Sequence, residues 1–94
     1  MPQSLPPPSD PRRRRLLFRS SHRGTHETDL LIGGYVAARI HSMTDADMDA
    51  LEEVMELPDV DLTDWLTGRL PIPPEHDCAM LRDMRAAAHG AGQQ

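Results

Sequence analysis

The chain has 94 residues, 38% of them hydrophobic, and a formal net charge of −5 at pH 7. This length allows a single domain with a modest core, which must be aliphatic because the chain has one Trp, one Tyr and one Phe. The chain has a single cysteine, Cys78, which excludes an internal disulfide and a cysteine-based zinc site. No apolar run approaches the roughly 20 residues of a membrane helix, and the N-terminus lacks the layout of a signal peptide. We therefore expect a soluble, cytoplasmic protein without membrane insertion.

The N-terminal quarter differs from the rest of the chain in charge. Residues 1–23 carry six arginines and one aspartate, whereas residues 24–94 carry four arginines and fourteen acids. Residues 1–11 are rich in proline, and we expect them to form a disordered leader. The next segment, 12–21, has the sequence RRRRLLFRSS and favours a short helix. Its buried side would come from Leu16, Leu17 and Phe18.

The basic run Arg12–Arg15 has two interpretations. Four adjacent arginines can bind the phosphates of a nucleic acid, or they can neutralise the acidic body of this protein or an acidic partner. The run is short and lacks interleaved aromatic residues, and the acidic remainder of the chain would repel a phosphate backbone. We therefore favour the second interpretation and expect no nucleic-acid partner.

Residues 25–42 predict a second helix, with Thr25 as its N-cap and Glu27 and Asp29 in its first turn. Its apolar face follows steps of three and four residues, with Leu31, Tyr35 and Ala38 at the centre and Leu30, Ile32, Val36 and Ile40 around them. Gly33-Gly34 weakens a helix interior, which indicates close packing against a neighbour or a local bend.

Three further helices are predicted, at 44–57, 61–68 and 75–89. The first opens on a capping box at Thr44 and ends at Pro58; the second has Asp61 as N-cap and Gly68 as C-cap. Their buried side chains are predicted to be Met48, Leu51, Val54 and Met55, then Leu62, Trp65 and Leu66, then Cys78, Leu81, Met84, Ala87 and Ala88. The prediction is an all-α single domain, a small bundle of about five short helices over 12–89, followed by a flexible tail at 90–94.

The junction between the first two helices carries the segment Arg23-Gly24-Thr25-His26-Glu27. A glycine tolerates a positive φ and a close backbone approach, so it suits a sharp corner, where Arg23 and Glu27 would be presented together. The alternative is a simple helix cap. His22 and His26 have a spacing that can bind a metal, but Gly24 interrupts the helix between them, and we expect neither a metal site nor a catalytic group. The residues alone favour a small helical interaction protein over an enzyme.

The order of these features resembles the SdhE-type flavinylation factors, which are related to mitochondrial succinate dehydrogenase assembly factor 2. Their R-G-x-x-E motif corresponds to residues 23–27, and similar segments follow at 51–53 and at 59–68, DVDLTDWLTG. The preceding R-L-L-F-R-S at 15–20 and the Asp29-Leu30 pair also look like bacterial members. The resemblance covers about residues 12–88; the leader lies outside it, and Thr28 stands where the family often has an apolar residue.

The resemblance implies a function. Such proteins bind the flavoprotein subunit of succinate dehydrogenase or fumarate reductase and promote covalent attachment of FAD to a histidine of that subunit. It implies a partner-binding surface formed by Arg23, Gly24 and Glu27, with His26 and Arg19 beside them. FAD then belongs to the partner, this chain holds no cofactor of its own, and we expect its free form to be a monomer. A small helical adaptor or a nucleic-acid-binding module using Arg12–Arg15 is the alternative.

Overall fold

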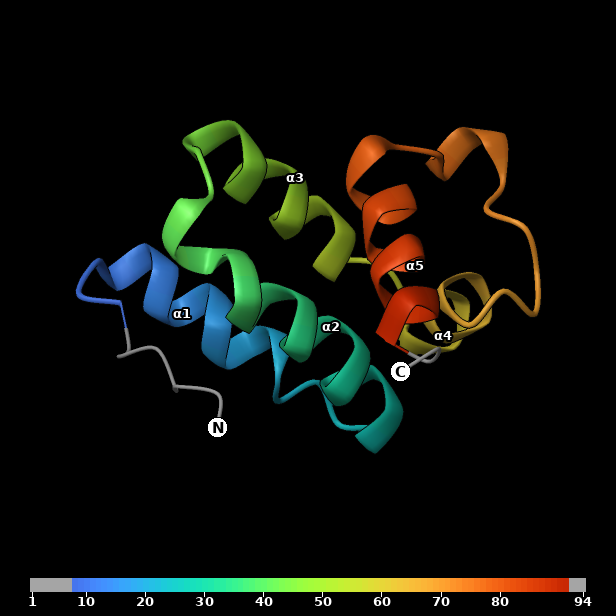
Figure 1. Ribbon diagram of the computed structural model, residues 1–94, viewed down its shortest axis with the longest axis horizontal. Helices are drawn as coiled ribbons and strands as arrows, with labels where there is room; N and C mark the ends of the chain where they lie inside the picture. Colours follow the sequence, from blue (N-terminus) through green and yellow to red (C-terminus); the bar gives the residue numbers. More distant parts are fainter. Residues whose placement is uncertain (1–7, 92–94) are drawn as a thin grey trace.

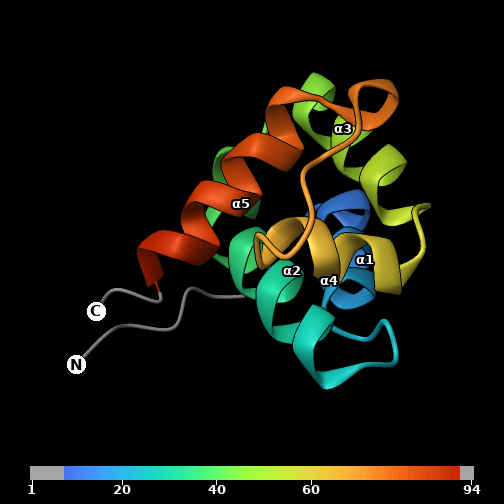
Figure 2. The ribbon, with the colours of Figure 1, turned by 90° about the vertical axis from the view of Figure 1, so that its right-hand side faces the viewer.

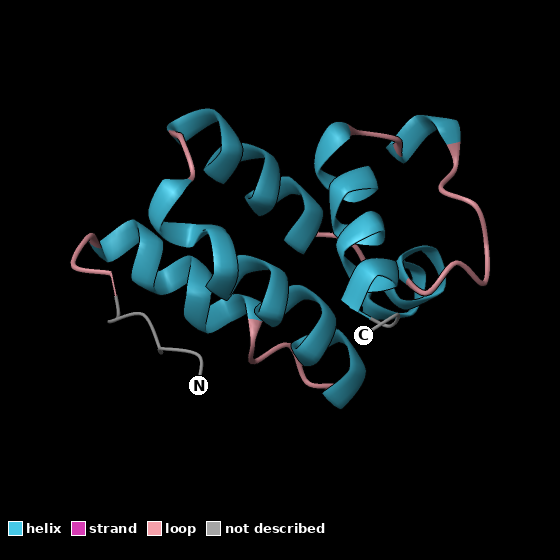
Figure 3. Ribbon diagram, viewed as in Figure 1, coloured by secondary structure: helices cyan, strands magenta, loops and turns pink. Residues whose placement is uncertain are grey.

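Every regular element of the described chain is helical. The computed structural model describes residues 8–91, so the predictions for residues 1–7 and 92–94 lie outside the described part. Within it, Figure 3 shows helices and connecting loops and no strand, which confirms the all-α prediction. The elements in order are α1 (Pro11–Ser20), α2 (His26–Arg39), the 3-10 helix η1 (Ile40–Ser42), α3 (Asp45–Met55), α4 (Asp59–Leu66), the 3-10 helix η2 (Pro74–His76) and α5 (Ala79–Ala91).

Helix α2 lies at the centre of the arrangement. It contacts α1, α4 and α5, while α3 contacts α1 and α5 and closes the remaining side (Figures 1 and 2). Helices α1 and α2 run side by side in opposite directions, joined by a short turn. Residues far apart in the chain are thereby brought to one end of the molecule, where this turn meets the link between α3 and α4.

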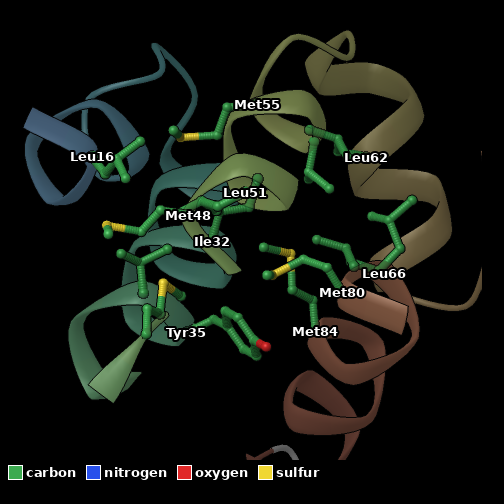
Figure 4. Close-up of a cluster of buried hydrophobic side chains, with 14 of the residues drawn as sticks. Leu16, Ile32, Tyr35, Met48, Leu51, Met55, Leu62, Leu66, Met80 and Met84 are labelled. Atoms are coloured by element: carbon green, nitrogen blue, oxygen red, sulfur yellow. The ribbon is translucent and has the colours of Figure 1, made fainter. Parts of the chain in front are cut away.

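The core is aliphatic and rich in methionine, as the composition predicts. Figure 4 shows side chains from all five α-helices meeting in one cluster. The buried hydrophobic residues are Leu16, Ile32, Tyr35, Val36, Ile40, Met43, Met48, Leu51, Val54, Met55, Leu62, Trp65, Leu66, Met80, Leu81 and Met84. Flexible methionine side chains fill irregular gaps, which suits a core with few aromatic rings.

Three apolar side chains predicted to be buried are exposed. Phe18 and Leu30 are 61% and 62% exposed, and Ala38 is also exposed. Helix α1 instead buries Leu16 and Ser20, one turn apart, so Phe18 points away from the body. Helix α2 turns a stripe inward at positions 28, 32, 35 and 36, and residue 30 falls on the opposite side of that stripe. Cys78 was also predicted to be buried and is only partly so, because it precedes the first turn of α5.

Several helix boundaries also differ from the prediction. Helix α1 begins at Pro11 with Asp10 as its N-cap, so residues 8–11 are not the disordered segment that was expected. Helix α4 begins at Asp59 rather than Asp61, because extended backbone at Pro58 starts the helix two residues earlier. In the predicted last helix, residues 74–76 form η2 and α5 begins at Ala79 and extends to Ala91.

The predicted caps of α2 and α3 are confirmed. The side chain of Thr25 accepts a hydrogen bond from the backbone of Thr28, and Thr44 and Asp47 form the complete capping box. The predicted close packing is also confirmed for Gly33: a Cβ atom there would lie 2.9 Å from the Cβ of Ser21 at the end of α1. The same construction at Gly34 meets nothing within 4 Å, so only the first glycine is needed for the α1–α2 contact.

Tyr35 joins α2 to α5 through a hydrogen bond to Asp83. Its hydroxyl donates to Asp83 Oδ2 at 2.5 Å, and the guanidinium of Arg39 lies 4.0 Å from its ring centroid. Burial, followed by the hydrogen bond to Asp83, raises the pKa of Tyr35 above its ordinary value of 10.0. The folded state therefore holds this proton more tightly than the unfolded chain does.

We expect the free energy of unfolding to fall above a pH of about 10, where the unfolded chain begins to release the tyrosine proton. Below that pH this contribution is fully present. The chain has no lysine and one tyrosine, so Tyr35 is its one side chain with an ordinary pKa near 10. Denaturant unfolding should be measured between pH 9 and 11.5, roughly the range that brackets the tyrosine transition. The free energy of unfolding should fall with pH in wild type and change much less in Tyr35→Phe. Parallel pH profiles of the two proteins would show that Tyr35 does not cause the fall.

Candidate functional site

The turn between α1 and α2, residues 21–25, forms a sharp corner at one end of the molecule. In Figure 2 it is the cyan loop at the lower edge, next to α4. Gly24 has φ +116°, a conformation that residues with a side chain rarely adopt. The predicted corner at Gly24 is therefore confirmed, and we call residues 21–27, the turn together with the first two residues of α2, the corner.

The guanidinium of Arg23 attaches the corner to the link between α3 and α4. Its Nε donates to Asp59 Oδ1 at 2.6 Å, Nη1 donates to the carbonyl of Met55 at 2.9 Å, and Nη2 donates to the carbonyl of Leu57 at 2.8 Å. The Arg23 side chain is only 11% exposed. A cation at the C-terminal carbonyls of α3 also interacts favourably with that helix dipole. The structure thus turns Arg23 inward and does not present it together with Glu27.

Hydrogen bonds to the first turn of α2 also hold the corner. The backbone N–H of Arg23 donates to Asp29 Oδ1 at 2.6 Å, and the N–H of Thr28 donates to Thr25 Oγ1 at 3.3 Å. Thr28 is fully buried, but its hydroxyl pairs with the hydroxyl and the carbonyl of Thr25. The threonine at this position is therefore satisfied locally, and these contacts hold the corner in one conformation.

The outward side of the corner is open. Gly24, His26 and Glu27 are all exposed, and a Cβ built on Gly24 would meet nothing within 4 Å. Within residues 8–91, the side chains of Glu27 and His26 make no hydrogen bond or ion pair. Glu27 lies in the first turn of α2, where the helix dipole favours a carboxylate. The corner thus presents a fixed, unpaired negative charge beside a glycine that another backbone can approach closely.

Two arginines of the basic run bind groups of this same chain. Arg12 binds Asp49 at 2.6 Å and Glu52 at 3.2 Å on α3, and these hydrogen bonds raise the pKa of its guanidinium. Arg13 pairs with Asp10 at 3.4 Å and donates to the carbonyl of Ile40. The favoured interpretation, neutralisation of this protein's own acidic body, is confirmed for Arg12, whereas Arg13 pairs with an aspartate of its own N-terminal segment.

Arg19 is the remaining predicted site residue, and it lies on α1 just before the corner. Its side chain is half exposed and reaches Glu56 at the end of α3, with 3.6 Å between Nη2 and Oε2. An exposed pair of this kind contributes little stability, so the guanidinium stays available to a partner.

The two histidines near the corner have different surroundings. The ring of His22 stacks on Phe18 with centroids 3.8 Å apart, whereas His26 is exposed at the start of α2. In the part of the chain that the structure describes, no group of three histidine, cysteine or acidic residues could hold a metal ion. Ser21 Oγ lies 3.2 Å from His22 Nδ1, but this nitrogen lies 2.7 Å from the carbonyl of Phe18 and must donate its proton there, so it cannot serve as a base for the serine. The features of the corner suit binding.

The sequence does not predict the partners of Arg23. Asp59 and Asp29 hold the corner in place. The sequence pattern placed Asp29 only in the first turn of the second helix, and Asp59 only in a segment that resembles the family. Nothing in the spacing links Arg23 to Asp59, because 36 residues separate them. It also missed Phe18 as an exposed ring on the helix that leads to the corner.

Comparisons with known proteins converge on one family. A family model described as "Flavinator of succinate dehydrogenase" matches residues 14–88. A protein of Acetobacter pasteurianus named FAD assembly factor SdhE is 56% identical over 73 residues, which cover 78% of this chain and 67% of that protein. Two mitochondrial proteins named succinate dehydrogenase assembly factor 2 also match. The one from Dictyostelium discoideum is 30% identical over 70 residues and the one from Arabidopsis thaliana is 41% identical over 61 residues.

The extent of these matches differs among the relatives. The aligned segment covers 74% of this chain and 50% of the Dictyostelium protein, and 65% of this chain and 32% of the Arabidopsis protein. The chain thus spans half or less of the length of these two mitochondrial relatives. No solved structure gives a significant match. In residues 8–91, none of the helices has the length and apolar character needed to cross a bilayer.

Proposed function

Because this chain belongs to the family of succinate dehydrogenase flavinators, we propose that it acts as an FAD assembly factor. In this proposal it binds the flavoprotein subunit of succinate dehydrogenase, or of the related fumarate reductase, and promotes covalent attachment of FAD to a histidine of that subunit. The bacterial relative with the name FAD assembly factor supports this function and an encounter in the cytoplasm. FAD stays with the partner, and this chain supplies no catalytic group.

The main support for the proposed binding mode is that the corner has a fixed backbone and an exposed outer side. Arg23 and Asp29 hold its backbone, while Gly24, His26 and Glu27 face solvent. A partner backbone can approach Gly24 closely, and Glu27 can accept a charge-assisted hydrogen bond from it. His26 and the half-exposed Arg19 flank this contact.

The proposed mechanism is positioning. A rigid surface that binds one conformation of the flavoprotein favours that conformation by its differential affinity. If this conformation places FAD against the acceptor histidine, the reaction gains from orientation without any reacting group from this chain. Arg23 then acts through the corner, as a positioning residue, rather than through contact with the partner.

The proposal is tested by covalent flavin on the flavoprotein subunit. We expect in-gel flavin fluorescence of the denatured subunit to rise at least about tenfold when this chain and FAD are added to the apo-subunit, since orientation effects of this kind are large. FAD alone is the control. Equal fluorescence with and without this chain would overturn the proposed function.

A further inference from the structure

The outward face of α1 carries positive charge and an aromatic ring that are not packed into the core. Arg14, Arg15, Phe18, Arg19 and His22 are all exposed, and their spacing places them on one side of the helix. We call these five residues the α1 face. Figure 1 shows α1 leading from the beginning of the described chain to the corner, so this face ends at Arg23-Gly24.

The arginines of α1 divide into two sets. Arg12 and Arg13 are bound by acids and a carbonyl of this chain, as described above. Within the described residues, Arg14 and Arg15 make no side-chain hydrogen bond or ion pair, and Arg19 has a single exposed one. The face therefore has uncompensated positive charge on a chain whose net charge is negative.

Phe18 gives the α1 face an apolar centre. It is 61% exposed, and His22 stacks against one side of its ring at an interplanar angle of 13°. Beside it lies a shallow hollow of about 410 Å³ lined by Pro11, Arg14, Arg15, Phe18 and Arg19. Aromatic and arginine side chains are the residues most enriched where proteins bind proteins.

We propose that the α1 face is a second docking surface, which binds an acidic segment carrying an apolar side chain on the flavoprotein partner. The apolar side chain occupies the hollow beside Phe18, and the acids of the segment pair with Arg14, Arg15 and Arg19. The inference rests on the proposed function and deepens it, since it adds a recognition surface next to the corner. Together they would fix the orientation of the partner at two places.

Charge complementarity favours a compact acidic segment over a nucleic acid. Asp49, Glu52, Glu53 and Glu56 line a shallow acidic hollow on α3, next to the helix that carries the α1 face. Arg12 and Arg19 pair with three of these acids, so the four carboxylates still exceed the two arginines. A long phosphate backbone passing over α1 would meet this excess of negative charge and be repelled, whereas a short segment confined to α1 would not.

The test is the affinity of the purified flavoprotein subunit for variants of this chain, measured by calorimetry at two salt concentrations. The double variant Arg14→Glu/Arg15→Glu should bind about tenfold or more weakly and lose most of the salt dependence, because opposite charges there become like charges. The matched control is Arg69→Glu/Arg82→Glu, which makes the same change of net charge at exposed arginines outside α1 and should bind like wild type. Phe18→Ala should also weaken binding without lowering stability.

Three outcomes would overturn the inference. Equal flavoprotein affinity of the α1 double variant and its control would show that the α1 face does not bind the flavoprotein. The proposed function would stay intact if wild type still promotes flavinylation. Concentration-dependent self-association of wild type that the α1 double variant abolishes would assign the face to a second copy of this chain. Tight binding of duplex DNA that depends on Arg14 and Arg15, with no effect of these residues on flavoprotein affinity, would assign it to nucleic acid. Loss of flavinylation by wild type itself would instead contradict the proposed function.

Discussion

Replacing Arg23 with alanine is expected to lower the free energy of unfolding by up to about 3 kcal/mol, the low end of the range for breaking a fully buried ion pair, because the side chains of Arg23 and Asp59 are only 11% and 23% exposed. The change leaves the carboxylate of Asp59 and the carbonyls of Met55 and Leu57 without the donors they have now. For a domain whose total stability is roughly 5–15 kcal/mol, this is a large fraction. Denaturant unfolding should show a lower midpoint with an unchanged slope.

The control for this prediction is Arg69→Ala. Arg69 also pairs with an aspartate, Asp64, at 3.4 Å, but its side chain is 69% exposed. Such a pair contributes less than about 1 kcal/mol, so this variant should unfold close to wild type. Arg23→Lys should fall near Arg23→Ala, since an ammonium group cannot reproduce the forked geometry of the guanidinium. If Arg23→Ala were as harmless as Arg69→Ala, the corner would not depend on this arginine.

The second large effect is expected at Gly24, where the size of the side chain should decide the outcome. Any residue with a Cβ is strained at φ +116°, at a cost on the order of 1–3 kcal/mol, and alanine and arginine share that cost. Space for the Cβ itself is open. Gly24→Arg should therefore abolish flavinylation by covering the corner, whereas Gly24→Ala should keep a measurable part of it.

Covalent flavin and thermal unfolding should be measured on both Gly24 variants. We expect equal unfolding temperatures and unequal flavin incorporation. Equal loss of flavinylation, together with loss of the helical circular dichroism signal in both, would show that Gly24 is needed for the fold and would remove it from the docking surface.

The features that sequence reasoning predicted correctly are local ones. Thr25 and Thr44 cap helices through contacts within four residues, and Gly68 ends α4 with a positive φ. The stripe of Met48 and Leu51 follows from helix periodicity alone. Each depends on chemistry that a window of a few residues contains, and each is confirmed.

The features that it missed depend on residues far along the chain. Leu16, Leu17 and Phe18 are adjacent, so a helix cannot bury all three, and contacts with α2 and α3 decide that Leu16 is buried and Phe18 exposed. The inward position of Arg23 likewise depends on where the α3–α4 link falls. The corner at Gly24 was thus predictable from its glycine, whereas the division between inward Arg23 and outward Glu27 was not.

Glu27 is the best position at which to test whether the corner acts on the flavoprotein, because its side chain is exposed and has no partner within the described residues. Glu27→Ala removes a carboxylate from the first turn of α2 and should cost at most about 1 kcal/mol of stability. The matched control is Glu53→Ala, an exposed acid on α3. Both variants should retain the wild-type fold.

The measurement is covalent flavin on the succinate dehydrogenase flavoprotein subunit, read as in-gel fluorescence with wild type, Glu27→Ala, Glu53→Ala and no added chain. We expect strong fluorescence with wild type and with Glu53→Ala, and fluorescence close to the no-chain lane with Glu27→Ala. Full flavinylation by Glu27→Ala would contradict it, because the outward side of the corner would then not be the surface that acts on the flavoprotein.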